Sequence, residues 1–241
     1  MGATLYSLSL SHPSHAVRLM LERKGIEHRV VDLLPGMHPA LVRALGFRRN
    51  TVPALRIDGR RLQGSREIAG FLDDLVPDPP LFPRDPAERR AVEEAERWGE
   101  EALQPVPRRL FRWGSLNHEY VRRWVAAEVV RFPAANLLAW SNTPVVALLA
   151  RAVDARDDVV RRDIATLDKL LGHADALIAD GTIGGDEPNA ADFQIATSVR
   201  ALLAFTDLRD RVEAHPSAEL ARRLQPHYPE PIPSILPPGW V

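Results

Sequence analysis

Residues 11–26 read SHPSHAVRLMLERKGI and follow a short alternating run, LYSLSL, at positions 5–10. The alternation predicts a β-strand, because successive side chains of a strand point to opposite faces. After a polar turn with one proline, Val17, Met20 and Leu21 recur at helical spacing, and Gly25 supplies the glycine that ends many helices. The sequence therefore predicts a strand, a polar turn and a helix, and a turn of this kind is a common place for chemistry.

The next fifty residues continue the alternation of strands and helices. Two strand-like segments and two helix-like segments are EHRVVDL (27–33), ALRIDGRRL (54–62), HPALVRALG (38–46) and SREIAGFLDDL (65–75). Asp58-Gly59 suits the type I′ turn of a hairpin, and Ser65 is the expected N-cap of its helix. The order βαβ, helix, ββα predicts a parallel pair of strands followed by an antiparallel hairpin.

A proline-rich stretch, VPDPPLFPRDP at 76–86, separates this half from the rest. Five prolines in eleven residues predict a stiff, extended linker. Asp85, Pro86 and Glu88 then give the N-cap, N1 and N3 positions of a helix. We expect an α/β domain at residues 1–76, a linker at 77–86 and an all-helical domain at 87–241.

Helical periodicity continues from the linker to about residue 224. The expected helices span 87–103, 118–132, 159–180 and 190–205. Asn189 and Asp192 form a capping box at the start of the last helix. The tail from Gln225 carries six prolines and is expected to be irregular.

Composition excludes several function classes. The 241 residues hold 31 Lys and Arg against 32 Asp and Glu, a balance that argues against nucleic acid or an anionic membrane as the main partner. The sequence has no apolar run long enough for a membrane span and no signal peptide, so we expect a cytoplasmic protein. It also has no cysteine, which excludes a thiolate nucleophile, and any thiol chemistry must use a ligand's thiol.

Four segments in order resemble motifs of the cytosolic glutathione transferases. They are the stretch at 11–26, NTVPAL (50–55), LQGSREIAGFL (62–72) and PNAADFQIA (188–196). The resemblance implies a thioredoxin-like α/β domain followed by an all-α helical bundle, in a homodimer. The serine in the first turn and the arginine-rich composition are typical of a serine-type, bacterial member.

The resemblance gives Ser11 a catalytic role, in which its hydroxyl donates a hydrogen bond to the sulfur of bound glutathione and favours the thiolate. A free thiol has a pKa of about 8.5, so only a small fraction is ionised at neutral pH. The alternative is that Ser11 only caps the following helix. Ser9 and Ser14 are competing hydroxyls, of which Ser14 is the expected cap. His12 is expected to tune the thiolate, and the alternative is a solvated side chain.

The resemblance also places the rest of the glutathione site. Pro53 is expected to be cis, so that the backbone of Val52 pairs with the ligand's cysteinyl unit. Ser65 at a helix start is expected to bind the γ-glutamyl carboxylate. Gly64 stands where the family has an acid or glutamine, and the candidate replacements are Gln63 or a residue from another subunit. His38, Asn50 and Thr51 are expected near the glycyl carboxylate.

Two further interpretations concern a metal and the second substrate. His12 and His15 are three residues apart, but no carboxylate or third imidazole is spaced to complete a metal site, so no metal is expected. The second substrate is expected between the two halves, against the helix after the linker. Four polar residues recur there at helical spacing, and a solvated charged face is the alternative. They are Arg97, Glu101, Gln104 and Arg108.

The sequence thus predicts an enzyme that activates a glutathione-type thiol, with glutathione as co-substrate, for transfer to a small electrophile. One alternative is a binding protein of the same fold without catalysis. Another is a transferase that uses a different bacterial low-molecular-weight thiol. Reductase chemistry through a mixed disulfide is excluded, because the first turn carries serine instead of cysteine.

Overall fold

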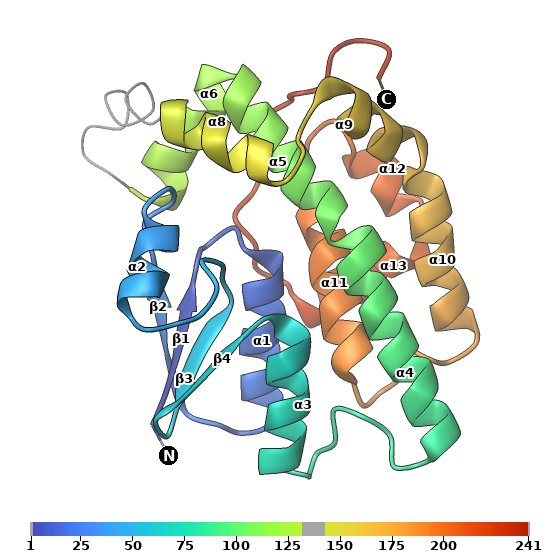
Figure 1. Ribbon diagram of the computed structural model, residues 1–241. Coiled ribbons are helices and arrows are strands. Elements are labelled where there is room, and N and C mark those ends of the chain that lie inside the picture. Colours follow the sequence, from blue (N-terminus) through green and yellow to red (C-terminus); the bar gives the residue numbers. More distant parts are fainter. Residues whose placement is uncertain (1, 132–142, 241) are drawn as a thin grey trace.

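The computed structural model describes residues 2–131 and 143–240 (Figure 1). Four strands form one sheet in the order β2-β1-β3-β4. The strands are β1 (Ala3–Ser7), β2 (His28–Asp32), β3 (Ala54–Ile57) and β4 (Arg60–Gln63). β1 pairs in parallel with β2 and antiparallel with β3, and β3 pairs antiparallel with β4. The predicted βαβ–ββα order is confirmed, and the N-terminal half is a thioredoxin-like domain.

Helices cover both faces of this sheet. They are α1 (His12–Arg23), α2 (His38–Ala44) and α3 (Ser65–Leu75). α1 packs beside α3, and their buried apolar residues join Leu5 and Leu55 in the main core. Tyr6 and Ala54, the neighbours of those two residues along their strands, form a second cluster with Val42 of α2. The alternation of side chains along β1 and β3 therefore separates the two layers of helices.

Turn geometry explains two of the glycine positions. In the β3–β4 hairpin Asp58 and Gly59 have φ values of 43° and 82°, which confirms the predicted turn. Gly64 has a φ of 94° and is itself the N-cap of α3. Ser65 is therefore the first helical residue, and the prediction of Ser65 as N-cap was wrong by one position.

The C-terminal half of the described chain is helical, as predicted. Its helices are α4 (Pro86–Trp98), α5 (Pro105–Asn117), α6 (Glu119–Trp124), α8 (Thr143–Ala152), α9 (Asp157–Ala165), α10 (Leu167–Ala179), α11 (Ala190–Leu203), α12 (Arg209–Glu213) and α13 (Pro216–Leu224). Two π-helical turns, η1 (Gly99–Leu103) and η2 (Val125–Val129), lie at the ends of α4 and α6. None of the helices in residues 2–131 and 143–240 is both long and apolar enough to cross a membrane.

Three expected helix boundaries needed correction. The helix expected at 87–103 continues through η1 into α5. Pro105 is tolerated there because it lies in the first turn of α5, where a backbone N–H would have no partner within the helix. The helix expected at 159–180 divides at Thr166, whose N–H and hydroxyl both bond to the carbonyl of Arg162. The helix expected at 118–132 runs as α6 and η2 to Val129, and its last residue lies outside the described part.

α11 lies at the centre of the helical domain and packs against α1, α4 and α13 (Figure 1). All 14 of its residues are buried. Its start is the predicted capping box, in which Asn189 accepts from the N–H of Asp192 and Asp192 accepts from that of Asn189. Past α13 the chain is irregular as expected, and the Tyr228 hydroxyl donates to the carbonyl of Leu10 at 2.9 Å. The tail therefore reaches back to the first turn.

The buried capping box generates a stability prediction. Asp192 is 1% exposed and accepts the N–H groups of Gly184 and Asn189, whereas the cap of α4, Asp85, is exposed. Asp192→Ala leaves buried donors unpaired, and we expect it to lower the free energy of unfolding by about 3 kcal/mol. We expect about 1 kcal/mol for Asp85→Ala. Urea unfolding measures both free energies. Equal decreases for the two variants would show that burial of the Asp192 cap adds nothing to its contribution to stability.

Candidate active site

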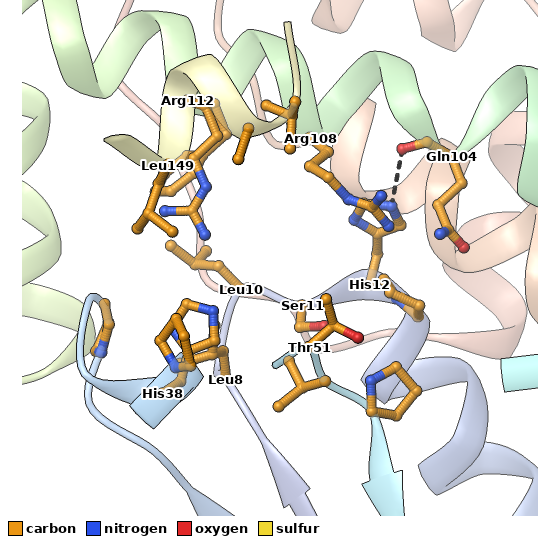
Figure 2. Close-up of a pocket in the computed structure, with 18 of the residues that line it drawn as sticks. Leu8, Leu10, Ser11, His12, His38, Thr51, Gln104, Arg108, Arg112 and Leu149 are labelled. Atoms are coloured by element: carbon orange, nitrogen blue, oxygen red, sulfur yellow. Dashed lines mark hydrogen bonds between the residues drawn. The ribbon is translucent and has the colours of Figure 1, made fainter. Parts of the chain in front are cut away.

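A cavity of about 460 Å³ lies between the two domains (Figure 2). On one side it is lined by the β1–α1 turn, by residues 49–53 and by the start of α3. On the other side it is lined by η1, α5, η2 and α8. The volume is within the range of ordinary small-molecule sites. The turn that begins the resemblance thus opens into a cavity that both domains build.

Ser11 lies in this cavity with its hydroxyl available. It occupies the N-cap position of α1, but its side chain makes no capping hydrogen bond. The Ser14 hydroxyl donates to Ser11 Oγ at 2.8 Å, so Ser14 supports Ser11 and is not the cap that we expected. The Ser9 hydroxyl donates to Asp32. Ser11 Oγ thus accepts one hydrogen bond and keeps its own O–H for a ligand.

His12 is a buried, neutral neighbour of Ser11. Its Nε2 lies 3.2 Å from the carbonyl oxygen of Gln104. Burial lowers the pKa of His12 well below its usual value, and the nearby charge of Arg108 lowers it further. The Nε2 of His15 instead faces the carbonyl of Ser9, so the two imidazoles do not converge on one point. Among residues 2–131 and 143–240, no group of three or more metal-binding side chains is placed to hold an ion.

Val52 and Pro53 line the cavity beside the first turn. The peptide bond between them is cis, as expected. Neither the N–H nor the C=O of Val52 is hydrogen-bonded to another residue in the described chain. A backbone donor and acceptor are therefore available at the position where an extended ligand can pair as an added strand.

Ser65 is a buried polar group without a partner. It is 1% exposed, it lines the cavity at the N-terminus of α3, and its Oγ makes no hydrogen bond. A buried hydroxyl without a partner costs free energy that a ligand can recover. The N-terminus of an 11-residue helix also favours a negative group.

Gly64 and Gln63 have structural reasons for their identities. The φ of 94° at Gly64 disfavours any residue with a side chain, and an added Cβ would lie 3.5 Å from the guanidinium of Arg49. Gln63 is buried and does not line the cavity. Its amide donates to the carbonyls of Arg49 and Thr51 and accepts the N–H of Arg49. Gln63 therefore fixes the loop that carries the cavity residues.

The three residues expected near a glycyl carboxylate all line the cavity. Asn50 and Thr51 are exposed at its edge. His38 is buried at the start of α2, and its Nδ1 has no hydrogen-bond partner. Burial lowers the pKa of His38 to about 4, and the charge of Arg112 contributes to the shift. The imidazole is thus neutral near pH 7.

Of the four residues expected on the second-substrate helix, two line the cavity and two do not. Gln104 and Arg108 line the cavity, whereas Arg97 and Glu101 are exposed on the solvated face. The sequence analysis missed two further residues of this wall, Glu100 and Arg112. Arg112 follows Arg108 by four residues, which is the spacing that could have identified it.

Comparison with known proteins gives this geometry a context. A family model described as the glutathione S-transferase N-terminal domain matches residues 5–80. Over 112 residues the chain is 32% identical to glutathione S-transferase 1 of Manduca sexta, a match that covers 45% of this chain and 52% of that protein. The matched part of the chain therefore spans about half the length of this relative.

Solved structures of similar shape extend the likeness to the whole chain. FzlA from C. crescentus has a TM-score of 0.62 at 18% identity, covering 97% of this chain and 96% of that one. A glutathione S-transferase from Sinorhizobium meliloti has a TM-score of 0.61 at 17% identity, covering 99% and 97%. At these identities the likeness concerns the fold alone. Residues 5–80 thus match the N-terminal domain of glutathione S-transferases, and the chain as a whole has the fold of one.

Proposed function

We propose that this chain is a glutathione S-transferase that activates the thiol of glutathione for transfer to a small electrophile. The observation that carries the proposal is Ser11, whose hydroxyl lies in the cavity beside the N-terminus of α1 and is not used as a helix cap. The family model over residues 5–80 supports the same assignment. Glutathione supplies the nucleophilic sulfur that a chain without cysteine lacks.

The residues present fit a tripeptide thiol. The unpartnered Ser65 Oγ and the N-terminus of α3 suit the γ-glutamyl carboxylate, because both favour a negative group. The free N–H and C=O of Val52 suit the backbone of the cysteinyl unit. Neutral His38 and Thr51 line the part of the cavity where the glycyl end is expected. Ser65 and Val52 keep hydrogen-bonding groups that the protein does not use, and His38 and Thr51 line the cavity.

Glu100 is the candidate partner of the ligand's α-ammonium group, which Gly64 cannot bind. Gly64 cannot offer a side chain to the ligand's α-ammonium group, and Gln63 is occupied within the protein. Glu100 from η1 is an acidic residue of the cavity wall, to which Gly64 and Ser65 also belong. Its carboxylate contacts Arg66 at 3.5 Å and retains capacity for another donor. We therefore assign the α-ammonium group to Glu100.

Ser11 then has a defined task. Its O–H donates to the ligand's sulfur and stabilises the thiolate relative to the thiol. The proton leaves to solvent, since His12 is buried and its Nε2 donates to the Gln104 carbonyl. The sulfur's electron pair forms a bond to the electrophilic carbon, and either a leaving group departs from that carbon with its bonding pair or, in an addition, the displaced π pair takes a proton from solvent at the neighbouring atom. A shift of about two units in the thiol pKa corresponds to roughly 2.7 kcal/mol.

Proton release on binding tests the role of Ser11. If the bound thiol has a pKa about two units below 8.5, binding of reduced glutathione releases roughly 0.7 proton at pH 7 and roughly 0.1 at pH 9.5, where the free thiol is already ionised. The lowered pKa of His12 keeps its imidazole out of this count. We expect Ser11→Ala to release less than half as much at pH 7. Calorimetry in two buffers of different ionisation enthalpy measures the proton number.

Ser9→Ala is the matched control for that measurement, because the Ser9 hydroxyl donates to Asp32 and is not needed for the sulfur. Equal proton release by the wild type and Ser11→Ala would contradict the catalytic role. Binding and proton release without turnover of any electrophile would identify a binding protein of the same fold. No binding of glutathione at millimolar concentration would point to a different thiol.

Two substitutions test the assignment of the γ-glutamyl unit. Ser65→Ala removes a hydrogen bond to the carboxylate, and Glu100→Gln removes a charge partner of the α-ammonium. We expect each to weaken glutathione binding about tenfold, the usual effect of one hydrogen bond to a charged group. The control ligand is cysteinylglycine, which is glutathione without its γ-glutamyl unit. It should bind the wild type and both variants with the same affinity. A variant that weakens the dipeptide equally would place its residue elsewhere in the site.

A further inference from the structure

The cavity wall formed by α5 carries two arginines that form no ion pair in the described chain. Arg108 and Arg112 are one helical turn apart and both are half-buried. Neither guanidinium makes a hydrogen bond or an ion pair with a residue in 2–131 or 143–240. Arg109 between them faces away from the cavity and forms a two-point contact with Asp163, at 2.6 and 2.7 Å. The helix thus pairs Arg109 with a carboxylate, whereas the N–H groups of Arg108 and Arg112 stay available, the Arg112 guanidinium lying 5.9 Å from the centre of the Phe111 ring.

The other charges around the cavity do not balance this pair. Glu100 is the acidic residue of the wall within the described chain, and its one charge is shared between Arg66, which it contacts, and Arg108, whose pKa it raises. Arg49 on the opposite wall is paired with Glu67 at 2.7 Å. The sequence of residues 132–142 contains no Asp or Glu. A net positive charge therefore remains on the α5 side.

The pKa values of the pair reflect burial and neighbouring charges. Burial and the charge of Arg108 together lower the pKa of Arg112 to about 10. Burial also lowers the pKa of Arg108, on which the carboxylate of Glu100 acts in the opposite direction and the charge of Arg109 in the same one. Both side chains stay cationic at neutral pH. Two like charges held together in a partly desolvated wall are unfavourable without an anion between or beside them.

The pair enters the cavity from the wall that faces the proposed glutathione groups, close enough for its charges to act on His12 and His38. Figure 2 shows Arg108 and Arg112 entering the cavity from α5, on the side opposite Ser11, Thr51 and His38. The apolar residues Leu10 and Leu149 line the same cavity. The part of the cavity beyond Ser11 thus combines apolar surface with two guanidinium groups, which suits a molecule with an apolar body and an acidic end.

We infer that Arg108 and Arg112 bind an anionic group of the second substrate, so that the enzyme acts on acidic electrophiles such as carboxylates, phosphates or sulfonates. The inference rests on the proposed function, since it assigns the electrophile's side of the same cavity. Guanidinium groups match the geometry of carboxylate and phosphate oxygens and bind them through paired hydrogen bonds. The anion replaces the counter-charge that the protein does not provide.

Two glutathione adducts that differ in one charge test the inference on the full chain. The probes are S-(4-carboxybenzyl)glutathione and its neutral amide, S-(4-carbamoylbenzyl)glutathione, with free glutathione as reference. We expect the wild type to bind the carboxylate at least about tenfold more tightly than the amide. Arg108→Gln and Arg112→Gln should each reduce this preference to about threefold or less while changing the affinity for free glutathione by less than threefold. Calorimetry at one ionic strength measures each dissociation constant.

Arg97→Gln is the matched control, because Arg97 is exposed on α4 and lies outside the cavity. It should keep the preference of the wild type. Far-UV circular dichroism and urea unfolding confirm that each variant folds. No preference for the carboxylate in the wild type would overturn the inference. A loss of affinity for free glutathione in the arginine variants would also overturn it, because the pair would then serve the tripeptide's own carboxylates.

A second arm keeps the two proposals distinguishable. 4-Methylbenzoate and 4-methylbenzamide are titrated without glutathione. Binding of the benzoate to the wild type but not to the Arg108→Gln/Arg112→Gln double variant supports the anion site, even if glutathione and both adducts fail to bind and the proposed function is wrong. Equal behaviour of benzoate and benzamide overturns the anion site whatever glutathione does.

Discussion

The complete burial of α11 is the constraint on which the rest of the structure depends. A helix buried on all sides must satisfy its polar side chains internally, because no water reaches them. Thr197 and Ser198 bond back to carbonyls one turn earlier, and Arg200 pairs with Glu230 and the carbonyl of Gln225. The last of these contacts draws the irregular tail against the helix. The tail then reaches the first turn, where Tyr228 holds the carbonyl of Leu10.

A second polar contact of α11 leads directly to the cavity. The Gln194 amide donates to the side chain of Gln104, whose backbone carbonyl faces Nε2 of His12. Close approach here needs Gly99, since a Cβ at that position would lie 3.0 Å from Ile195 and 3.1 Å from Gln194. The N-terminus of α1, and Ser11 with it, is therefore positioned by the core of the other domain. The site exists only when both domains are packed together.

Local sequence patterns predicted the fold and much of the site, and tertiary contacts decided what they missed. The capping box at Asn189 and the hairpin turn at Asp58 are short-range patterns with one favourable geometry, and both were predicted correctly. The free hydroxyl of Ser65 depends on the backbone angle of Gly64, which no neighbouring residue reveals. The occupied amide of Gln63 depends on a loop 14 residues away. Whether Arg112 finds a carboxylate is likewise a property of the packed chain.

The positive charges of Arg108 and Arg112 act on the other groups of the cavity. Burial lowers the pKa values of His12 and His38, and the charges of Arg108 and Arg112 add to the two shifts, so both imidazoles stay neutral near pH 7. The same field acts on any acid in the cavity with the opposite preference, because nearby positive charge favours an anion. An acidic electrophile in the cavity is such an acid. In the proposed reaction the two arginines would attract this partner, whereas a carboxylate that neutralised them would weaken the attraction.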